Sequence, residues 1–409
     1  MDICSSVSLN PLFQRVQQIP SPVHNSQSND RYSLLPLLHH PCKSSPPLTR
    51  ASLEAPLLSY DHASLEPSRT LSFSHTWNLH FHMIMYGVET IPSCVNPLMS
   101  KYGELRSLQE AYCAFSMMRS RDTISWNIMM NLYVKNGRDI DALNLFLQMQ
   151  EVRIESDRVT FLCVLQACGN VGRLECGYVV HFLILDVGMA SHVALATALI
   201  DMYAKCGALD DANHVFDNMA ERNVVSWTAI IAANVSYGHY DVALSLFYGQ
   251  MSEEGIKPNQ VTFTKVLQAC FRLSDGEAVH ASMVSYGLGY DEASGTALVD
   301  MYGKCKALES ACVVFDKMQT LSKNVVTWTT MMNIYLQHGE IEKALYLYNM
   351  LLQGGIVIPN EFTFSTALTA CAEMAALAEG EMSPLVEGET IHRHIICKGL
   401  DSEVVETAL

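Results

Sequence analysis

Apolar residues recur at helical spacing through most of the chain, and residues 123–157 show the pattern clearly. One stripe at i, i+3, i+4 and i+7 comprises Trp126, Met129, Met130 and Tyr133. A second stripe comprises Ala142, Leu145, Phe146 and Met149. Asn136 and Gly137 end the first helix, Asp139 begins the second, and a loop closes the stretch at Asp157. The pattern predicts two helices joined by a turn, each with one apolar face.

This helical pair belongs to a series. Three of the four tryptophans are 101 residues apart: Trp126, Trp227 and Trp328. Three cysteines follow at spacings of 102 and 101: Cys168, Cys270 and Cys371. One third of 101 is about 34 residues, the length of a helix-turn-helix repeat. Because neither helix of a pair can bury its face alone, the pairs must stack, which predicts an all-α solenoid with a continuous core.

The first 74 residues have a different composition. Nine of the fourteen prolines precede residue 75, no helical period persists there, and the first fifty residues are rich in serine and poor in acids. We expect residues 1–74 to be disordered. The composition is typical of an organellar transit peptide, with an unstructured tail as the alternative. It does not distinguish mitochondrion from chloroplast. The most apolar stretch, 177–204, is interrupted by polar residues, so we expect no membrane partner.

The net charge of -16 by itself disfavours nucleic-acid binding, because phosphate neutralisation needs clustered Lys and Arg. Sorting the charges by position changes this expectation. The first helices of the pairs are expected to carry seven bases, Lys101, Lys135, Arg158, Lys205, Lys265, Arg272 and Lys304, and four acids, Asp201, Asp300, Glu361 and Glu373. We therefore expect this surface to be positive, at +3, with the surplus acid on second helices and loops.

The repeats resemble pentatricopeptide repeats, specifically the plant type that alternates standard (P), long (L) and short (S) forms. VVSWTAIIAANVSYGHYDVALSLFYGQMSEEGIKPN is close to the P form and ALATALIDMYAKCGALDDANHVFDNMAERN to the S form. The resemblance implies a right-handed α/α superhelical solenoid. It divides 92–402 into nine repeats: S 92–122, P 123–157, L 158–192, S 193–223, P 224–259, L 260–291, S 292–324, P 325–360 and L 361–402. Residues 75–91 resemble a degenerate partial repeat, and 403–409 a truncated S repeat.

In this family each repeat reads about one RNA base through its fifth and last residues, while an aliphatic second residue sandwiches the base. The resemblance assigns these roles to six pairs: Asn96 with Asp122, Asn127 with Asp157, Thr197 with Asn223, Thr228 with Asn259, Thr296 with Asn324, and Thr329 with Asn360. In the family, Asn with Asp favours uridine and Thr with Asn favours adenosine. The L repeats offer Leu162 with His192, Thr264 with Asp291, and Ser365 with Ser402, which we leave unread.

Two alternatives stay open. Small polar residues at helix starts also act simply as caps, although capping alone does not explain six matched pairs. A helical-pair solenoid can also serve as a protein-binding adaptor.

Catalytic chemistry has little support in the sequence. Plant relatives of this type often end in a deaminase-like domain, whose zinc site needs H-x-E followed by C-x-x-C. His338 and Glu340 form an H-x-E, but only Cys371 and Cys397 follow it, 26 residues apart. We therefore expect no deaminase-like domain, no catalytic residue, no metal site and no cofactor. We interpret the recurring cysteines as packing residues.

These interpretations predict a protein of a plant organelle, mitochondrion or chloroplast, that binds single-stranded RNA sequence-specifically. It would act in RNA processing or as a specificity factor for C-to-U editing, with the enzymes supplied in trans. Family resemblance alone supports the editing role. The predicted target is 5′-UUxAAxAA-3′, with x at the L repeats.

Overall fold

The computed structural model describes residues 69–319, 322–355 and 357–377, and every regular element in this part of the chain is a helix. The helices divide into two compact units, and the boundary along the chain falls between Glu221 and Arg222. The first unit contains α3 (Arg69–Met85), α4 (Pro92–Glu104), α5 (Leu108–Met117), α6 (Thr123–Lys135), α7 (Asp139–Glu151), α8 (Arg158–Val171), α9 (Leu174–Asp186), α10 (Val193–Lys205) and α11 (Leu209–Asp217).

The second unit contains ten further helical segments. They are α12 (Val224–Ser236), α13 (Tyr240–Ser245), the π-helix η4 (Leu246–Met251), α14 (Gln260–Gln268), α15 (Leu273–Ser285), α16 (Glu292–Lys304), α17 (Leu308–Lys317), α18 (Val325–Gln337), α19 (Ile341–Gly354) and α20 (Glu361–Leu377). No helix of the described ranges has the length and apolar character that crossing a membrane requires.

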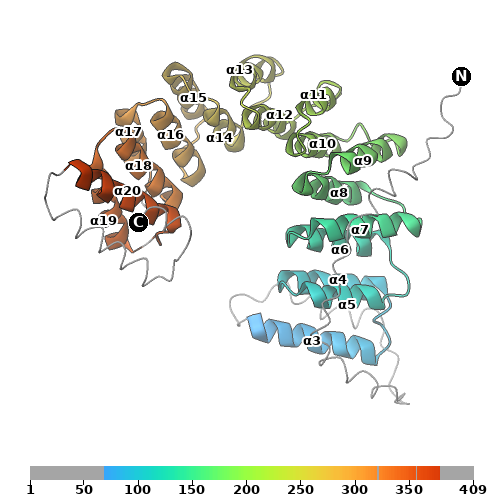
Figure 1. Cartoon of the computed structure of the whole chain (residues 1–409). Helices are drawn as coiled ribbons and strands as arrows, with labels where there is room; N and C mark the ends of the chain where they lie inside the picture. Colours follow the sequence, from blue (N-terminus) through green and yellow to red (C-terminus); the bar gives the residue numbers. More distant parts are fainter. Residues whose placement is uncertain (1–68, 320–321, 356, 378–409) are drawn as a thin grey trace, which may run out of the picture. The chain divides into compact units, whose positions relative to one another are not determined.

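Within each unit the helices stack in chain order as antiparallel pairs (Figure 1). The first helix of one pair packs against the first helix of the next, as α4, α6, α8 and α10 do in the first unit. The series α12, α14, α16, α18 and α20 does the same in the second unit. The predicted all-α solenoid is therefore confirmed.

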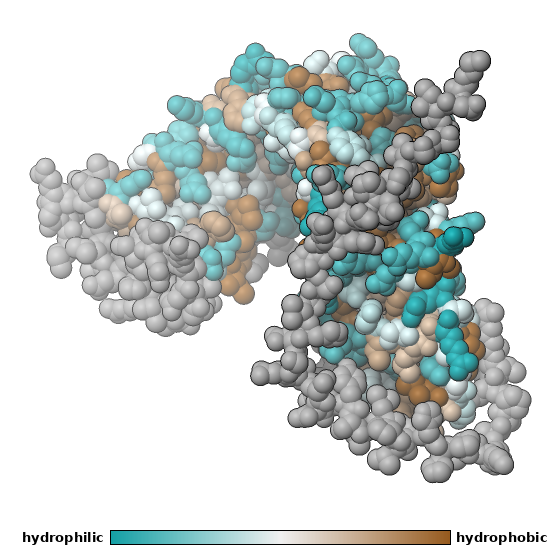
Figure 2. Space-filling view, turned by 45° about the vertical axis from the view of Figure 1, so that its right-hand side comes forward, coloured by the Kyte–Doolittle hydropathy of each residue, from teal (hydrophilic) through white to brown (hydrophobic). Residues whose placement is uncertain are grey.

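The predicted apolar faces form the core. Trp126, Met129 and Met130 of α6 are buried, and so are Ala142 and Met149 of α7, which packs against α6. Trp227 and Trp328 occupy the same position in α12 and α18 and are buried as well. Figure 2 shows teal and brown residues interleaved over the described surface in view, without one continuous apolar area. The apolar residues thus lie mainly between neighbouring helices.

The first described helix begins earlier than the sequence predicts. Helix α3 starts at Arg69, so residues 69–74 belong to it and not to the N-terminal segment. It packs against α4, where Nδ1 of His80 lies 3.0 Å from the hydroxyl of Tyr102. The proposed transit peptide up to residue 68 and the truncated S repeat at 403–409 lie outside the described residues.

One second helix contains a π-helical turn. The stretch 224–259 has 36 residues where 123–157 has 35, and its sequence LFYGQM replaces LFLQM. The extra residue is absorbed in η4, which covers Leu246–Met251. A π turn takes up one inserted residue without rotating the rest of the helix off its packing face. Phe247 and Met251 consequently remain buried, as Phe146 and Met149 do in α7.

Candidate nucleic-acid interface

The last residue of a repeat caps the first helix of the next repeat. Asp122 accepts a hydrogen bond from the backbone N–H of Ser125 at 2.8 Å, and Asn259 accepts one from Thr262 at 2.9 Å. The same bond is formed by Asp157, Asn223, Asn324 and Asn360. The capping role that the sequence offered as an alternative is therefore present at all six sites. It occupies one oxygen of each side chain and leaves the other polar atom for further contacts.

The two Asn/Asp pairs are joined directly. The amide nitrogen Nδ2 of Asn127 donates to Oδ1 of Asp157 at 2.9 Å, across a separation of 30 residues. The amide of Asn96 donates to Asp122 at 3.3 Å. Each pair thus brings the fifth residue of one repeat to the boundary with the next, where the last residue lies.

Three Thr/Asn pairs are joined through a second hydroxyl. Oγ1 of Thr228 lies 2.7 Å from Oγ1 of Thr262, which also contacts Oδ1 of Asn259 at 3.0 Å. Thr327 connects Thr296 to Asn324 in the same way, and Thr363 connects Thr329 to Asn360. The linking hydroxyl always belongs to the third residue of the next repeat. Its regular Ser or Thr is visible in the sequence but is expected there from helix capping alone, so it does not by itself indicate this link.

The sixth pair is divided between the two units. Thr197 belongs to the first unit, where its hydroxyl donates to the carbonyl of Val193 at 2.8 Å. Asn223 belongs to the second unit and caps α12 with bonds from Val225 and Ser226. Each residue has the local role that its counterparts have elsewhere.

The L-repeat positions differ from the six pairs. Leu162 has no polar side-chain atom, and His192 forms no side-chain cap on α10. The hydroxyl of Thr264 donates to the carbonyl of Gln260, while Asp291 caps α16 and accepts a bond from Gln260. Ser402 lies outside the described residues. The described L positions thus form no pair of the kind seen at the other sites.

Asp122 and Asp157, the last residues of the two Asn/Asp pairs, are ionised. Burial raises the pKa of Asp157, but hydrogen bonds from Thr160 and Asn127 outweigh burial, and the pKa lies below its usual value. The pKa of Asp122 is lowered in the same sense, since bonds from Ser125 and Asn96 outweigh its burial. Both groups are ionised at neutral pH and can only accept hydrogen bonds.

An exposed apolar side chain lies at the start of many first helices. The second residues of six repeats are apolar and 43–63% exposed: Ile124, Val159, Val225, Val261, Val326 and Phe362. The fifth residues of four repeats are almost covered: Asn96, Asn127, Thr228 and Thr329 are 6–8% exposed. A solvent-exposed apolar side chain next to a polar pair is the arrangement expected of a site for a flat ring. The ring would pack against the apolar side chain and form hydrogen bonds with the polar pair.

The expected positive surface of the first helices was wrong. As the structure bounds them, these helices carry six bases, Lys101, Lys135, Arg158, Lys205, Lys265 and Lys304, and six acids, Glu104, Asp201, Glu292, Asp300, Glu361 and Glu373, so their net charge is zero. Three of the bases are also paired on their own helices. The pairs are Lys101 with Glu104, Lys205 with Asp201, and Lys304 with Asp300, at 2.6 to 2.8 Å.

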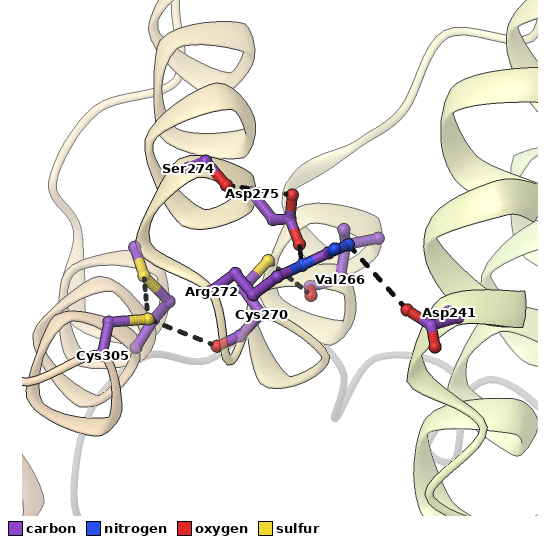
Figure 3. A network of polar contacts seen from close by, with 8 residues as sticks. Asp241, Val266, Cys270, Arg272, Ser274, Asp275 and Cys305 are labelled. Atoms are coloured by element: carbon purple, nitrogen blue, oxygen red, sulfur yellow. Dashed lines mark hydrogen bonds and ion pairs between the residues drawn. The ribbon is translucent and has the colours of Figure 1, made fainter.

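Arg272 is one base that was expected on a first helix and does not lie on one. It lies beyond α14, which is only nine residues long, and directly precedes α15 without a side-chain capping bond. Figure 3 shows its guanidinium between Asp275, at 2.7 Å, and Asp241 of the preceding helical pair, at 3.9 Å. The shortened L repeat at 260–291 thus moves this arginine off the first-helix surface.

The recurring cysteines and histidines make packing contacts between neighbouring helices. Cys305 contacts the carbonyl of Cys270 and the sulfur of Met301 in the network of Figure 3. Burial raises the pKa of Cys270 to about 12, so this thiol stays protonated and unreactive. His181 and His280 each contact a tyrosine of the next first helix, Tyr203 or Tyr302. Among the described residues no group of His, Cys, Asp and Glu has the arrangement that holds a metal ion.

The fold and the repeated junctions define a helical-repeat protein in which five helical pairs present a similar small polar site. A family model described as PPR repeat family matches residues 121–170, 222–272 and 323–373. A second model, described as PPR repeat, matches residues 195–224 and 296–322. The chain therefore belongs to the pentatricopeptide repeat family.

Its relatives include many plant proteins of this family. The Arabidopsis thaliana pentatricopeptide repeat-containing protein At1g50270 is 35% identical over 311 residues, which are 75% of this chain and 52% of that protein. CRR2, chloroplastic, of the same plant is 34% identical over 76% of this chain and 48% of its own length. At3g02330, mitochondrial, is 35% identical over 70% of this chain and 34% of its own length. The chain spans about half the length of the curated relatives it matches first.

Solved structures share the fold. A crystal structure of the pentatricopeptide repeat protein PPR10 in complex with an 18-nt psaJ RNA element matches with a TM-score of 0.62 and 16% identity, over 84% of this chain and 51% of that one. PPR10 from maize in a further crystal structure matches with a TM-score of 0.53. At this identity the likeness establishes the fold alone.

Proposed function

We propose that this protein binds single-stranded RNA sequence-specifically, with each P or S repeat reading one base. The observation that carries the proposal is the recurrence of one site: a polar pair at the repeat boundary beside an exposed apolar side chain. The related fold of PPR10, crystallised with an RNA element, supports it. The repeats run parallel to the RNA, with the N-terminal repeat at the 5′ side, so the proposed target is 5′-UUxAAxAA-3′.

The hydrogen-bonding atoms of the Asn/Asp pairs suit uracil. Because Asp157 is ionised, the atom of Asn127 that faces it must be the amide nitrogen. Its second N–H and the remaining carboxylate oxygen of Asp157 form one donor beside one acceptor. Uracil presents a carbonyl oxygen beside its N3–H, which is the complementary pattern.

The Thr/Asn pairs suit adenine by the same reasoning. A backbone N–H can only donate, so Oδ1 of Asn259 faces Thr262 and the amide nitrogen is left to donate outward. The hydroxyl proton of Thr228 is directed at the carbonyl of Val224 at 2.6 Å, so this oxygen can accept from a base. Adenine offers N1 as acceptor and its N6 amino group as donor, which complements this pair.

The biological setting follows from the relatives and the sequence together. Several relatives are named chloroplastic or mitochondrial, which supports a place in a plant organelle. We propose membership of the subfamily that alternates P, L and S forms, a role in RNA processing or C-to-U editing, and enzymes supplied in trans. The chain would act by binding rather than as a catalyst.

A binding titration tests the proposal. Purified protein is titrated with labelled UUCAACAA, with oligomers in which one specified base is exchanged, and with a scrambled oligomer of the same composition. The proposal predicts that each specified exchange weakens binding by about fivefold or more, the lower range for one base contact. Equal affinity for designed and scrambled oligomers would contradict it and favour the protein-binding adaptor.

A further inference from the structure

The third residue of most repeats is a hydroxyl buried beneath the polar pair. Seven such residues are at most 1% exposed: Ser125, Thr160, Ser226, Thr262, Ser294, Thr327 and Thr363. Each backbone N–H of this set donates to the preceding cap residue. At Thr160, Ser226, Thr262 and Thr363 the hydroxyl also accepts a bond from the backbone N–H of that cap residue, which accounts for part of its bonding. A buried hydroxyl is costly unless it is bonded, so its contacts indicate its role.

The threonines of this set contact the fifth residue of the preceding repeat. Oγ1 of Thr160 lies 2.7 Å from Oδ1 of Asn127, closer than the 2.9 Å that separate it from Oδ1 of Asp157. Thr262, Thr327 and Thr363 lie 2.6 to 3.0 Å from the hydroxyls of the preceding fifth residues. The contact spans two repeats, and a helix cap does not require it.

Two serines of the set provide the contrast. The hydroxyl of Ser125 bonds to Oδ1 of Asp122 at 2.7 Å, while Oδ1 of Asn96 is buried without a hydrogen-bond partner. The hydroxyl of Ser294 is itself buried and unbonded. Threonine is branched at Cβ, which restricts χ1, whereas serine turns more freely. The methyl group of threonine therefore helps to aim the hydroxyl at the neighbouring repeat.

We propose that the third-residue threonine is a positioning residue that fixes the orientation of the base-reading pair before RNA binds. This inference rests on the proposed RNA-binding function. Thr160 holds the amide of Asn127 with its oxygen inward and its nitrogen toward Asp157 and the base. The hydroxyl of Thr262 lies 2.7 Å from that of Thr228, whose proton is directed at the carbonyl of Val224, so the contact keeps the Thr228 oxygen in its accepting orientation.

The proposal makes the two uridine sites unequal. Asn127 is held by Thr160 as well as by Asp157, whereas Asn96 is held by one longer bond of 3.3 Å. A preorganised group loses less freedom when its ligand binds and rejects a wrong ligand more strongly. Discrimination between uridine and cytidine should therefore be stronger at the second specified base than at the first.

Three variants of the full chain test the proposal. Thr160→Val keeps the side-chain volume and the branched Cβ but removes the hydroxyl. The ratio of U affinity to C affinity at the second base should then fall about fivefold, because one net hydrogen bond contributes about 1 kcal/mol. Thr160→Ser should retain part of the ratio. The matched control Ser125→Ala removes a cap hydroxyl that does not touch Asn96, and should lower the melting temperature without changing the ratio at the first base.

Two readouts separate positioning from capping. The side-chain amide resonance of Asn127 should shift and broaden in Thr160→Val in the absence of RNA, while that of Asn96 stays in place. If Thr160→Val melts lower but keeps the wild-type ratio and the Asn127 resonance, the threonine is a cap only and this inference fails alone. If the wild-type protein has no base preference, the proposed function fails and the inference with it.

Discussion

At the scale of single residues, the polar pairs combine two roles. The last residue of each repeat caps a helix with one oxygen and presents its other polar atom beyond the cap. The pairs and their positions could be predicted from the sequence, because the resemblance to pentatricopeptide repeats assigns them to the fifth and last residues of each repeat. The threonines that link them could not, because a Ser or Thr at the third position of a helix is expected from capping alone.

Trp126 offers a test of hydrogen-bond satisfaction within the repeats. Its indole N–H is buried without a partner, whereas the indole of Trp227 donates to Glu254 at 2.9 Å, and Glu254 also pairs with Arg222. The position of Glu254 is occupied by the exposed Val152 in the earlier repeat. Val152→Glu should supply the missing acceptor and raise the free energy of unfolding by about 1 kcal/mol.

Chemical denaturation measures this gain. The control is the same change in a Trp126→Phe background, which lacks the indole N–H and should show no stabilisation. An equal gain in both backgrounds would assign the effect to surface charge instead.

His181 makes stability depend on pH. Burial lowers its pKa below 6.5, nearby His214 lowers it further, and Asp211 opposes them. The unfolded chain therefore takes up a proton at a higher pH than the folded chain does. The stabilising contribution is complete above about pH 6.5 and is lost as the pH falls toward the folded-state pKa. His181→Gln should flatten the decline in unfolding free energy between pH 7 and pH 5, measured by urea denaturation; an unchanged slope would contradict this.

At the scale of helices, the apolar periodicity predicted the paired elements and their buried faces. It could not predict the π turn, because the stripe of 224–259 reads as an ordinary helix until it is compared with a shorter repeat. The apolar periodicity also placed Arg272 on a first helix. The stretch 260–291 lacks residues, so α14 is shorter than the other first helices and ends before Arg272. Insertions and deletions shift helix ends without changing the apolar period.

Deleting Gly249 tests the origin of the π turn. The deletion converts the spacing of Phe247 and Met251 from four residues to three, which matches Phe146 and Met149 in α7. It also removes a glycine from a helix interior, so the unfolding free energy should rise by about 0.5–1 kcal/mol. The matched deletion of Leu147 in α7 should destabilise the fold, since it turns Met149 away from the core. Destabilisation by both deletions would contradict this account of the insertion.

At the scale of the whole molecule, the charges predict weak dependence of RNA binding on salt. The first helices have no net charge, and of the six bases on these helices within the described ranges, Lys135, Arg158 and Lys265 form no ion pair within their own helix. With at most three phosphates neutralised, the logarithm of the binding constant should fall against the logarithm of salt with a slope no steeper than about −2. A titration series in KCl measures the slope. A much steeper slope would show that other cations contact the phosphates.

The central claim is that the paired residues select the base, and a swap of one pair tests it most directly. In Asn127→Thr with Asp157→Asn, Thr160 already supplies the linking hydroxyl, so the site should adopt the arrangement seen at Thr228, Thr262 and Asn259. Binding of UUCAACAA and UACAACAA is compared for the wild-type protein and the double variant. The account predicts that the preference at the second base moves from U to A by about fivefold or more, with the other positions unchanged. A double variant that folds and keeps the wild-type preference would contradict it.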